Sequence, residues 1–159
     1  MKKVKIIFLA LISISILNLT ACKKDDAADD NPTISGGSMS LKVDGTAWSA
    51  SLASQAVNTN GVINVTGSDS DAHQVAITLL NVTEPGTYSV GGMGNQNGIR
   101  WTEGLASTDS YLANFALGSG SITITELTSS KIVGTFSGSV ANTSQTTKKI
   151  TEGTFNVSF

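Results

Sequence analysis

The sequence has few of the residues that cross-link small proteins or carry out their chemistry. Its 159 residues include one cysteine, one histidine and two prolines. A single cysteine can form neither an intramolecular disulfide nor a cysteine-based metal site. Ten basic residues stand against twelve acidic ones, and no basic stripe is present to attract phosphate groups. We therefore expect no nucleic-acid partner.

The chain also lacks an apolar run long enough for a permanent membrane span. Residues 6–19 are uncharged and rich in Ile and Leu, and they follow Lys2, Lys3 and Lys5. A transmembrane helix needs about 20 apolar residues, whereas a basic start before a shorter apolar run is typical of a signal peptide. Residues 1–21 are therefore predicted to be a signal peptide.

The end of this segment reads Leu19-Thr20-Ala21-Cys22. Ordinary secretory cleavage favours small residues at positions −3 and −1, but position −3 is Leu19 and only Ala21 is small. The tetrapeptide resembles the bacterial lipobox, which implies cleavage between Ala21 and Cys22 and lipid attachment to the Cys22 thiol. Because one acyl chain binds a membrane only marginally, the two or three chains of a lipoprotein would anchor it permanently.

Residues 22–32 are predicted to be a disordered acidic tether. After the cysteine this segment contains no apolar side chain larger than Ala, so it cannot bury enough surface to offset the entropy cost of ordering. Lys24-Asp25-Asp26 resembles the export signal that directs lipoproteins of Bacteroidota to the outer face of the outer membrane. We expect a lipid-anchored protein of the outer membrane that faces the cell exterior; the alternative is the periplasmic face.

Residues 33–159 are rich in Ser, Thr, Gly and Val and are long enough for one domain. Apolar and polar residues alternate with a period of two, which indicates strands. Asp44-Gly45 and Asn60-Gly61 separate such runs and predict two-residue hairpin turns. The first turn would place Leu41 opposite Trp48, so that the apolar residues of both strands share one face.

Three strands are predicted in the last third of the chain, at residues 121–127, 132–140 and 154–159. An even-numbered loop between the first two would put Ile124 and Phe136 on opposite faces of the sheet. We therefore predict a connection of three or five residues around Ser129 to Lys131, with a β-bulge.

Overall, eight to ten short strands predict an all-β fold, an antiparallel meander that closes into a lipocalin-like barrel or a β-sandwich. Residues 101–115 are assigned to strand and loop.

Several segments of this domain are similar to a family of small lipoproteins from Bacteroidota with no assigned function. The similar segments are residues 41–48, 85–88, 120–126, 133–136 and 150–157. They are strand-and-turn patterns. The resemblance implies an all-β domain after a lipobox signal, and it brings no catalytic residues with it.

Few residues suggest chemistry. His73, with Asp69 or Asp71 and a serine, could nominally form a hydrolytic triad, but no G-x-S-x-G motif accompanies it, and a surface histidine is the preferred interpretation. Asp69-Ser70-Asp71 could offer oxygens to calcium, yet the EF-hand spacing is absent. We predict no catalytic residue, no metal and no cofactor.

The best candidate for binding is the loop that begins at Gly91 and runs into Trp101. Asn95 and Asn97 can hydrogen-bond a polar ligand, and Arg100 and Trp101 can stack on a sugar. The alternative is that Trp101, like Trp48, lies in the core.

The favoured function is a non-enzymatic module that binds a ligand, a glycan or a protein partner. The second is a structural or accessory subunit of an envelope complex, and a hydrolase using His73 is the least favoured.

Overall fold

The computed structural model describes residues 36–159. The predicted signal peptide, the predicted lipid-attachment residue Cys22 and the predicted acidic tether lie outside the described residues. The strands are β1 (Gly37–Val43), β2 (Thr46–Ser49), β3 (Ala53–Thr59), β4 (Val62–Ser68), β5 (Gln74–Leu80), β6 (Gly86–Val90), β7 (Gly98–Thr102), β8 (Ser110–Ala113), β9 (Ser119–Leu127), β10 (Lys131–Ala141) and β11 (Thr147–Ser158), with a 3-10 turn η1 (Ser107–Asp109). Within this part of the chain, no helix could span a membrane.

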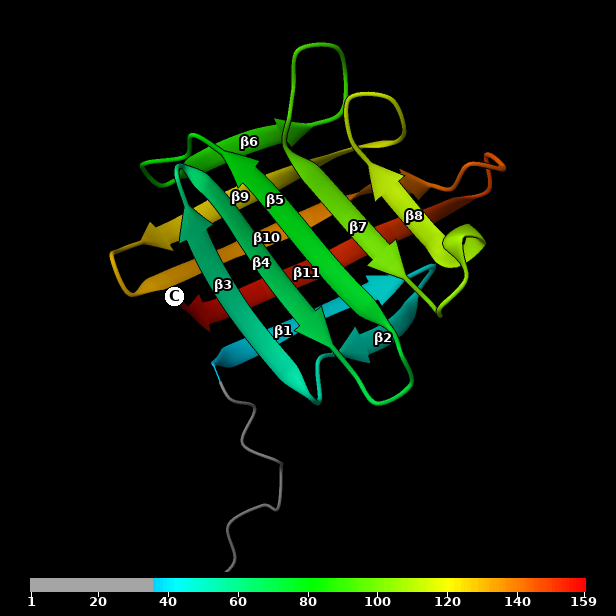
Figure 1. Ribbon diagram of the computed structural model, residues 1–159, viewed down its shortest axis with the longest axis horizontal. Helices are drawn as coiled ribbons and strands as arrows, with labels where there is room; N and C mark the ends of the chain where they lie inside the picture. Colours follow the sequence, from blue (N-terminus) through cyan, green and yellow to red (C-terminus); the bar gives the residue numbers. More distant parts are fainter. Residues whose placement is uncertain (1–35) are drawn as a thin grey trace, which may run out of the picture. The chain divides into compact units, whose positions relative to one another are not determined.

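The eleven strands form one antiparallel sheet that curls into a half-barrel. The curl depends on β10, whose first edge pairs with β11 along its length. Its second edge pairs with β9 from Ile132 to Ser139 and then with β8 at Ala141. One layer is therefore β6-β9-β10-β11-β1-β2 and the other is β8-β7-β5-β4-β3, which crosses in front of it in Figure 1. The predicted all-β antiparallel class is confirmed, with one strand more than the expected upper number.

Both predicted hairpin turns are present. Asp44 and Gly45 have φ angles of 51° and 86°, and Asn60 and Gly61 have 52° and 83°. Positive φ at both central residues is the type I′ geometry, whose twist matches that of the strands. Leu41 pairs with Trp48 as predicted. The first hairpin therefore directs the Trp48 side chain toward the interior of the half-barrel.

The predicted odd-numbered connection and register shift between β9 and β10 are also present. Three residues, 128–130, connect the strands, and the register shifts between Val133 and Gly134. Ile124 and Phe136 are consequently both buried. The core between the layers is aliphatic for most of its length, and its largest fully buried side chains are Phe155, Ile63, Ile77, Leu79, Ile99, Ile122, Ile124, Ile132 and Ile150.

Candidate functional site

A cleft of about 600 Å³ opens at one end of the half-barrel. The β1–β2 hairpin, the loop between β4 and β5, the end of β7 and the start of β11 contribute its walls. We call it the tryptophan cleft because both tryptophans of the chain line it. Its lining side chains are Val43, Asp44, Thr46, Ala47, Trp48, Ser49, Ser51, Asp69, Ser70, Asp71, His73, Trp101, Glu103 and Lys148.

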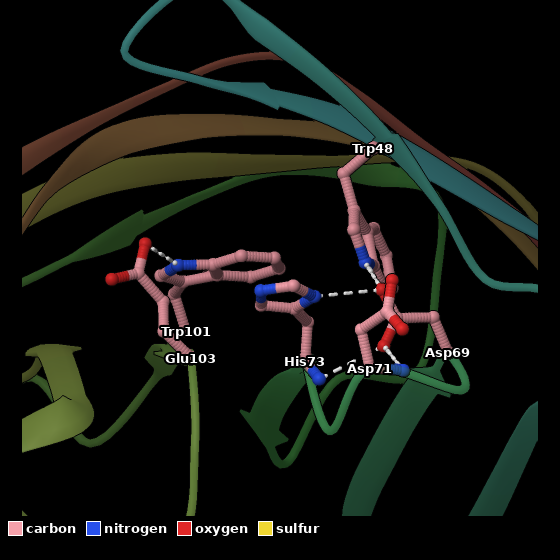
Figure 2. Close-up of polar contacts among 6 residues, drawn as sticks. All are labelled: Trp48, Asp69, Asp71, His73, Trp101 and Glu103. Atoms are coloured by element: carbon pink, nitrogen blue, oxygen red, sulfur yellow. Dashed lines mark hydrogen bonds and ion pairs between the residues drawn. The ribbon is translucent and has the colours of Figure 1, made fainter.

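Asp69 organises one wall of the cleft through four hydrogen bonds. Its Oδ1 accepts the backbone N–H groups of Asp71 and His73, each at 2.9 Å. Its Oδ2 accepts the Trp48 indole N–H at 2.7 Å and lies 2.8 Å from His73 Nδ1. One carboxylate therefore shapes the β4–β5 loop and holds two aromatic side chains that come from opposite layers (Figure 2).

The environment of Asp69 favours its ionised form. Burial by itself raises the pKa of this carboxyl group, but the hydrogen bonds from His73, Trp48 and Asp71 outweigh burial and lower the pKa below its ordinary value. Because an ionised carboxylate can only accept hydrogen bonds, the proton of the His73 contact resides on Nδ1. His73 Nε2 has no hydrogen-bond partner among the described residues, so it remains available to a ligand.

The three rings pack against one another. The Trp48 and Trp101 rings meet edge to face, with centroids 5.3 Å apart and an interplanar angle of 82°. The His73 ring stacks on Trp101, with centroids 5.6 Å apart and an angle of 7°. Trp101 is only 3% exposed, whereas Trp48 is half-buried. Of the two indoles, Trp48 is thus the one that presents surface to a ligand.

Glu103 and Lys148 form the opposite wall. Glu103 Oε1 accepts the Trp101 indole N–H at 2.8 Å and lies 2.8 Å from Lys148 Nζ. Burial raises the pKa of Glu103, but the bonds from Lys148 and Trp101 lower it overall. The hydrogen bond to Glu103 raises the pKa of Lys148. Lys148 Nζ also lies 5.0 Å from the centre of the Tyr111 ring, so this ammonium is held between a carboxylate and an aromatic face.

The arrangement limits the chemistry that these residues can perform. An Asp69–His73 pair could in principle serve as a general base, but among residues 36–159 no hydroxyl group is hydrogen-bonded to His73 for activation as a nucleophile. Ligand atoms of Asp69, Asp71 and His73 lie within 4.8 Å of one another. However, a metal ion bound to Asp69 would have to displace hydrogen bonds that fix Trp48 or the loop backbone. Both oxygens of Asp69 are thus already committed to contacts within the described fold.

The structure does not bring the four predicted binding residues together. Asn95 and Asn97 both donate to the Ser89 carbonyl, and Asn97 also accepts the Leu80 N–H, so they stabilise their own loop. Arg100 is exposed and lies 3.4 Å from Gln74 Oε1. Trp101 points inward, because adjacent residues of a strand face opposite sides. Arg100 and Trp101 therefore cannot contact the same ligand, although a role for either alone stays a prediction.

Four charged or aromatic members of the cleft are not among the site residues predicted from the sequence: Asp44, Trp48, Glu103 and Lys148. A fifth, His73, is interpreted there as a surface residue. Trp48 was assigned to the core, yet its half-buried ring lines the cleft. Glu103 lies two residues after Trp101, and this spacing could have indicated that both side chains approach the same wall. No local signal marks Lys148. His73 is partly exposed, but its ring belongs to the stack rather than to an open surface.

Comparison with known proteins gives a family and no function. No curated protein matches the chain, and no solved structure matches it. A family model described as a domain of unknown function, DUF6252, matches residues 35–157, which covers all of β1 to β10 and nearly all of β11. The chain belongs to the DUF6252 family.

Proposed function

We propose that the protein is a non-enzymatic binding module whose ligand occupies the tryptophan cleft. The observation that carries this proposal is a cleft that combines aromatic surface with unused polar groups. Its volume of about 600 Å³ falls within the range of small-molecule sites. Among the described residues, no partner contacts His73 Nε2 or the Asp71 carboxylate, and Glu103 Oε2 has no hydrogen bond.

The side chains of the cleft are held in place before any ligand arrives. Asp69 fixes Trp48 and His73, and Glu103 fixes Trp101 and Lys148. Ordering a flexible side chain upon binding costs about 0.5–1.5 kcal/mol. A wall that is already ordered avoids much of this cost, which supports recognition of a small ligand with few contacts.

Intrinsic fluorescence of the purified full chain tests this proposal directly. The chain has two tryptophans, and both line the cleft, so a ligand in the cleft changes their emission. A panel of oligosaccharides, amino sugars, amines and nucleosides is titrated, and at least one class is expected to give a saturable change. Trp48→Phe should weaken the response, whereas Arg100→Gln, on the outer face of β7, should leave it intact. A panel without any saturable change would contradict the proposal.

We also propose that the domain is attached to the outer membrane through lipid on Cys22 and faces the cell exterior. The lipobox-like sequence, the short apolar leader and the Lys24-Asp25-Asp26 segment support this placement. Mass spectrometry should find acyl chains on wild type, while Cys22→Ala should leave the membrane fraction. Protease added to intact cells should degrade the protein; complete protection would favour the periplasmic face instead.

A second candidate, an accessory subunit of an envelope complex, is favoured by two exposed loop tips. Met93 is 93% exposed in the β6–β7 loop, and Phe115 is 65% exposed in the β8–β9 loop. The loops lie side by side (Figure 1), since a Cβ atom on Gly91 would be 2.7 Å from the Gly118 carbonyl oxygen. If this candidate is correct, Met93→Ser with Phe115→Ser will abolish co-purification of a partner without altering ligand-induced fluorescence.

A further inference from the structure

We propose that the tryptophan cleft recognises a small organic cation through its protonated amine. This inference rests on the proposed function, because it names the ligand class of the same cleft. It is carried by the distribution of charge, by the carboxylate oxygens that remain unused, and by the way in which the chain holds one of its own ammonium groups.

Negative charge is concentrated at the cleft. Eight side-chain carboxylates occur in residues 36–159, and four of them line it: Asp44, Asp69, Asp71 and Glu103. Of the five basic side chains in the same residues, only Lys148 lines it. With His73 neutral, these five groups carry a formal charge of −3. A cation is therefore attracted to the cleft, and an anionic ligand is repelled.

Within residues 36–159, three of the four carboxylates retain an oxygen without a hydrogen bond. Asp44 accepts the Lys149 N–H through Oδ1, and no described residue hydrogen-bonds to its Oδ2. Glu103 contacts Trp101 and Lys148 through Oε1, and no described residue hydrogen-bonds to its Oε2. The exposed Asp71 carboxylate has no partner among the described residues. Asp69 is different, because both of its oxygens are occupied, so its role is to position the rings.

Lys148 shows how the cleft accommodates an ammonium group. Its Nζ is 2.8 Å from a Glu103 oxygen and 5.0 Å from the centre of the Tyr111 ring. A carboxylate on one side and an aromatic face on the other stabilise a cation by ion pairing and by cation–π attraction. The half-buried Trp48 ring and the Asp71 carboxylate provide the same two kinds of group at the other wall, and no lysine or arginine of residues 36–159 lines that wall.

A neutral sugar of the same size fits these walls less well. Its hydroxyl groups can donate to the carboxylates, but covering an ionised carboxylate without a counter-charge carries a large desolvation cost. A protonated amine supplies both the hydrogen bonds and the charge. Glucosamine oligomers and their N-acetylated counterparts share one skeleton and differ in this charge, which makes them a matched pair of probes.

Tryptophan fluorescence of the full chain is measured during titration with glucosamine oligomers, N-acetylglucosamine oligomers and spermidine. The amine-bearing probes are expected to bind at least tenfold more tightly than the acetylated oligomer, with affinity that falls as salt is added. Asp71→Asn should weaken amine binding about fivefold, the upper range for one partly solvated ion pair. Glu84→Gln removes the same charge from the β5–β6 turn, outside the cleft, and should leave the affinity unchanged.

The possible outcomes distinguish failure of the cationic ligand class from failure of the proposed ligand-binding function. Preference for glucosamine oligomers over spermidine would identify an amino sugar as the source of the amine, and the reverse order a free polyamine; both support the inference. Equal or tighter binding of the acetylated oligomer would overturn the cationic class while supporting a ligand-binding cleft. If no probe changes the emission, the inference fails, and a blank result from the wider ligand panel would then remove the proposed function as well. Unchanged thermal unfolding of Asp71→Asn confirms that the variant is folded.

Discussion

At the scale of single residues, Asp69 is the side chain on which the cleft depends most. All four of its partners donate hydrogen bonds: two backbone N–H groups, the Trp48 indole and His73 Nδ1. An amide in its place has one acceptor oxygen, and its NH2 group would face donors. Asp69 therefore stabilises the fold through the number of hydrogen bonds that it accepts as well as through its charge.

Asp69→Asn is expected to lower the free energy of unfolding by about 2 kcal/mol, because several hydrogen-bond donors in a partly buried site lose their acceptor. Chemical denaturation measures the change, and the tryptophan emission of the folded protein should shift because the Trp48 N–H loses its acceptor. Asp71→Asn, in the same loop, should change stability by less than about 0.5 kcal/mol. Equal losses in the two variants would show that the Asp69 network contributes no specific stability.

Ser54 is an exception to the rule that buried polar groups form hydrogen bonds. Its side chain is completely buried, and its Oγ has no hydrogen-bond partner among the described residues. A buried hydroxyl group without a partner costs about 1–3 kcal/mol of desolvation. Ser54→Ala is therefore expected to be neutral or to raise the melting temperature in a thermal scan. A clear decrease would reveal a partner that Ser54 needs.

At the scale of elements, the β1–β2 hairpin connects backbone conformation to the cleft. Gly45 has a φ of 86° and open space where a Cβ would lie. Gly45→Ala therefore isolates the conformational cost of a left-handed residue, which we expect to be about 1–2 kcal/mol in denaturant unfolding. Because the hairpin carries Trp48, ligand affinity should fall as well.

Gly61→Ala is the matched substitution in the other type I′ turn. Its φ is 83°, and an added Cβ would lie 3.0 Å from Asn81 Oδ1, so the stability loss should equal or exceed that of Gly45→Ala. The β3–β4 hairpin contributes no residue of its turn to the cleft, and ligand affinity should therefore be preserved. Loss of affinity in both variants would show that the hairpins affect the cleft only through overall stability.

The same elements show what the sequence could and could not predict. Both hairpins and the β9–β10 bulge were predictable because strand period and turn chemistry are local. Strand alternation is equally local, and it places Arg100 and Trp101 on opposite faces of β7. The cleft itself was not predictable. Its walls join Trp48, Asp69, Trp101 and Lys148, which meet only because β10 pairs with different strands along one edge, and no local pattern encodes that pairing.

At the scale of the whole molecule, the ionised groups of the cleft link stability to pH. Asp69 and Glu103 have pKa values lowered from 3.8 and 4.5. A group whose pKa is lower in the folded state stabilises the protein above its unfolded pKa, and this stability is lost as pH falls. Lys148, with a pKa raised from 10.5, stabilises below that value and loses the contribution as pH rises.

Stability should accordingly be highest between about pH 5 and pH 10 and fall on both sides. Denaturant unfolding across pH 3 to 11 measures the profile. Lys148→Met removes the group that titrates on the alkaline side, so its decline above pH 10 should be shallower than that of wild type. An identical alkaline decline in the variant would assign it to other groups.

The pairing of β1 with β11 also sets the order in which the domain can mature. Synthesis proceeds from the N-terminus, so β1 is made first and its long-edge partner β11 is made last. Until β11 exists, β1 has only the four-residue strand β2 beside it, and β10 lacks the neighbour along its entire first edge. Contacts between such distant segments form slowly. Among the described strands, the sheet therefore stays incomplete until the twelve-residue strand β11 has been synthesised.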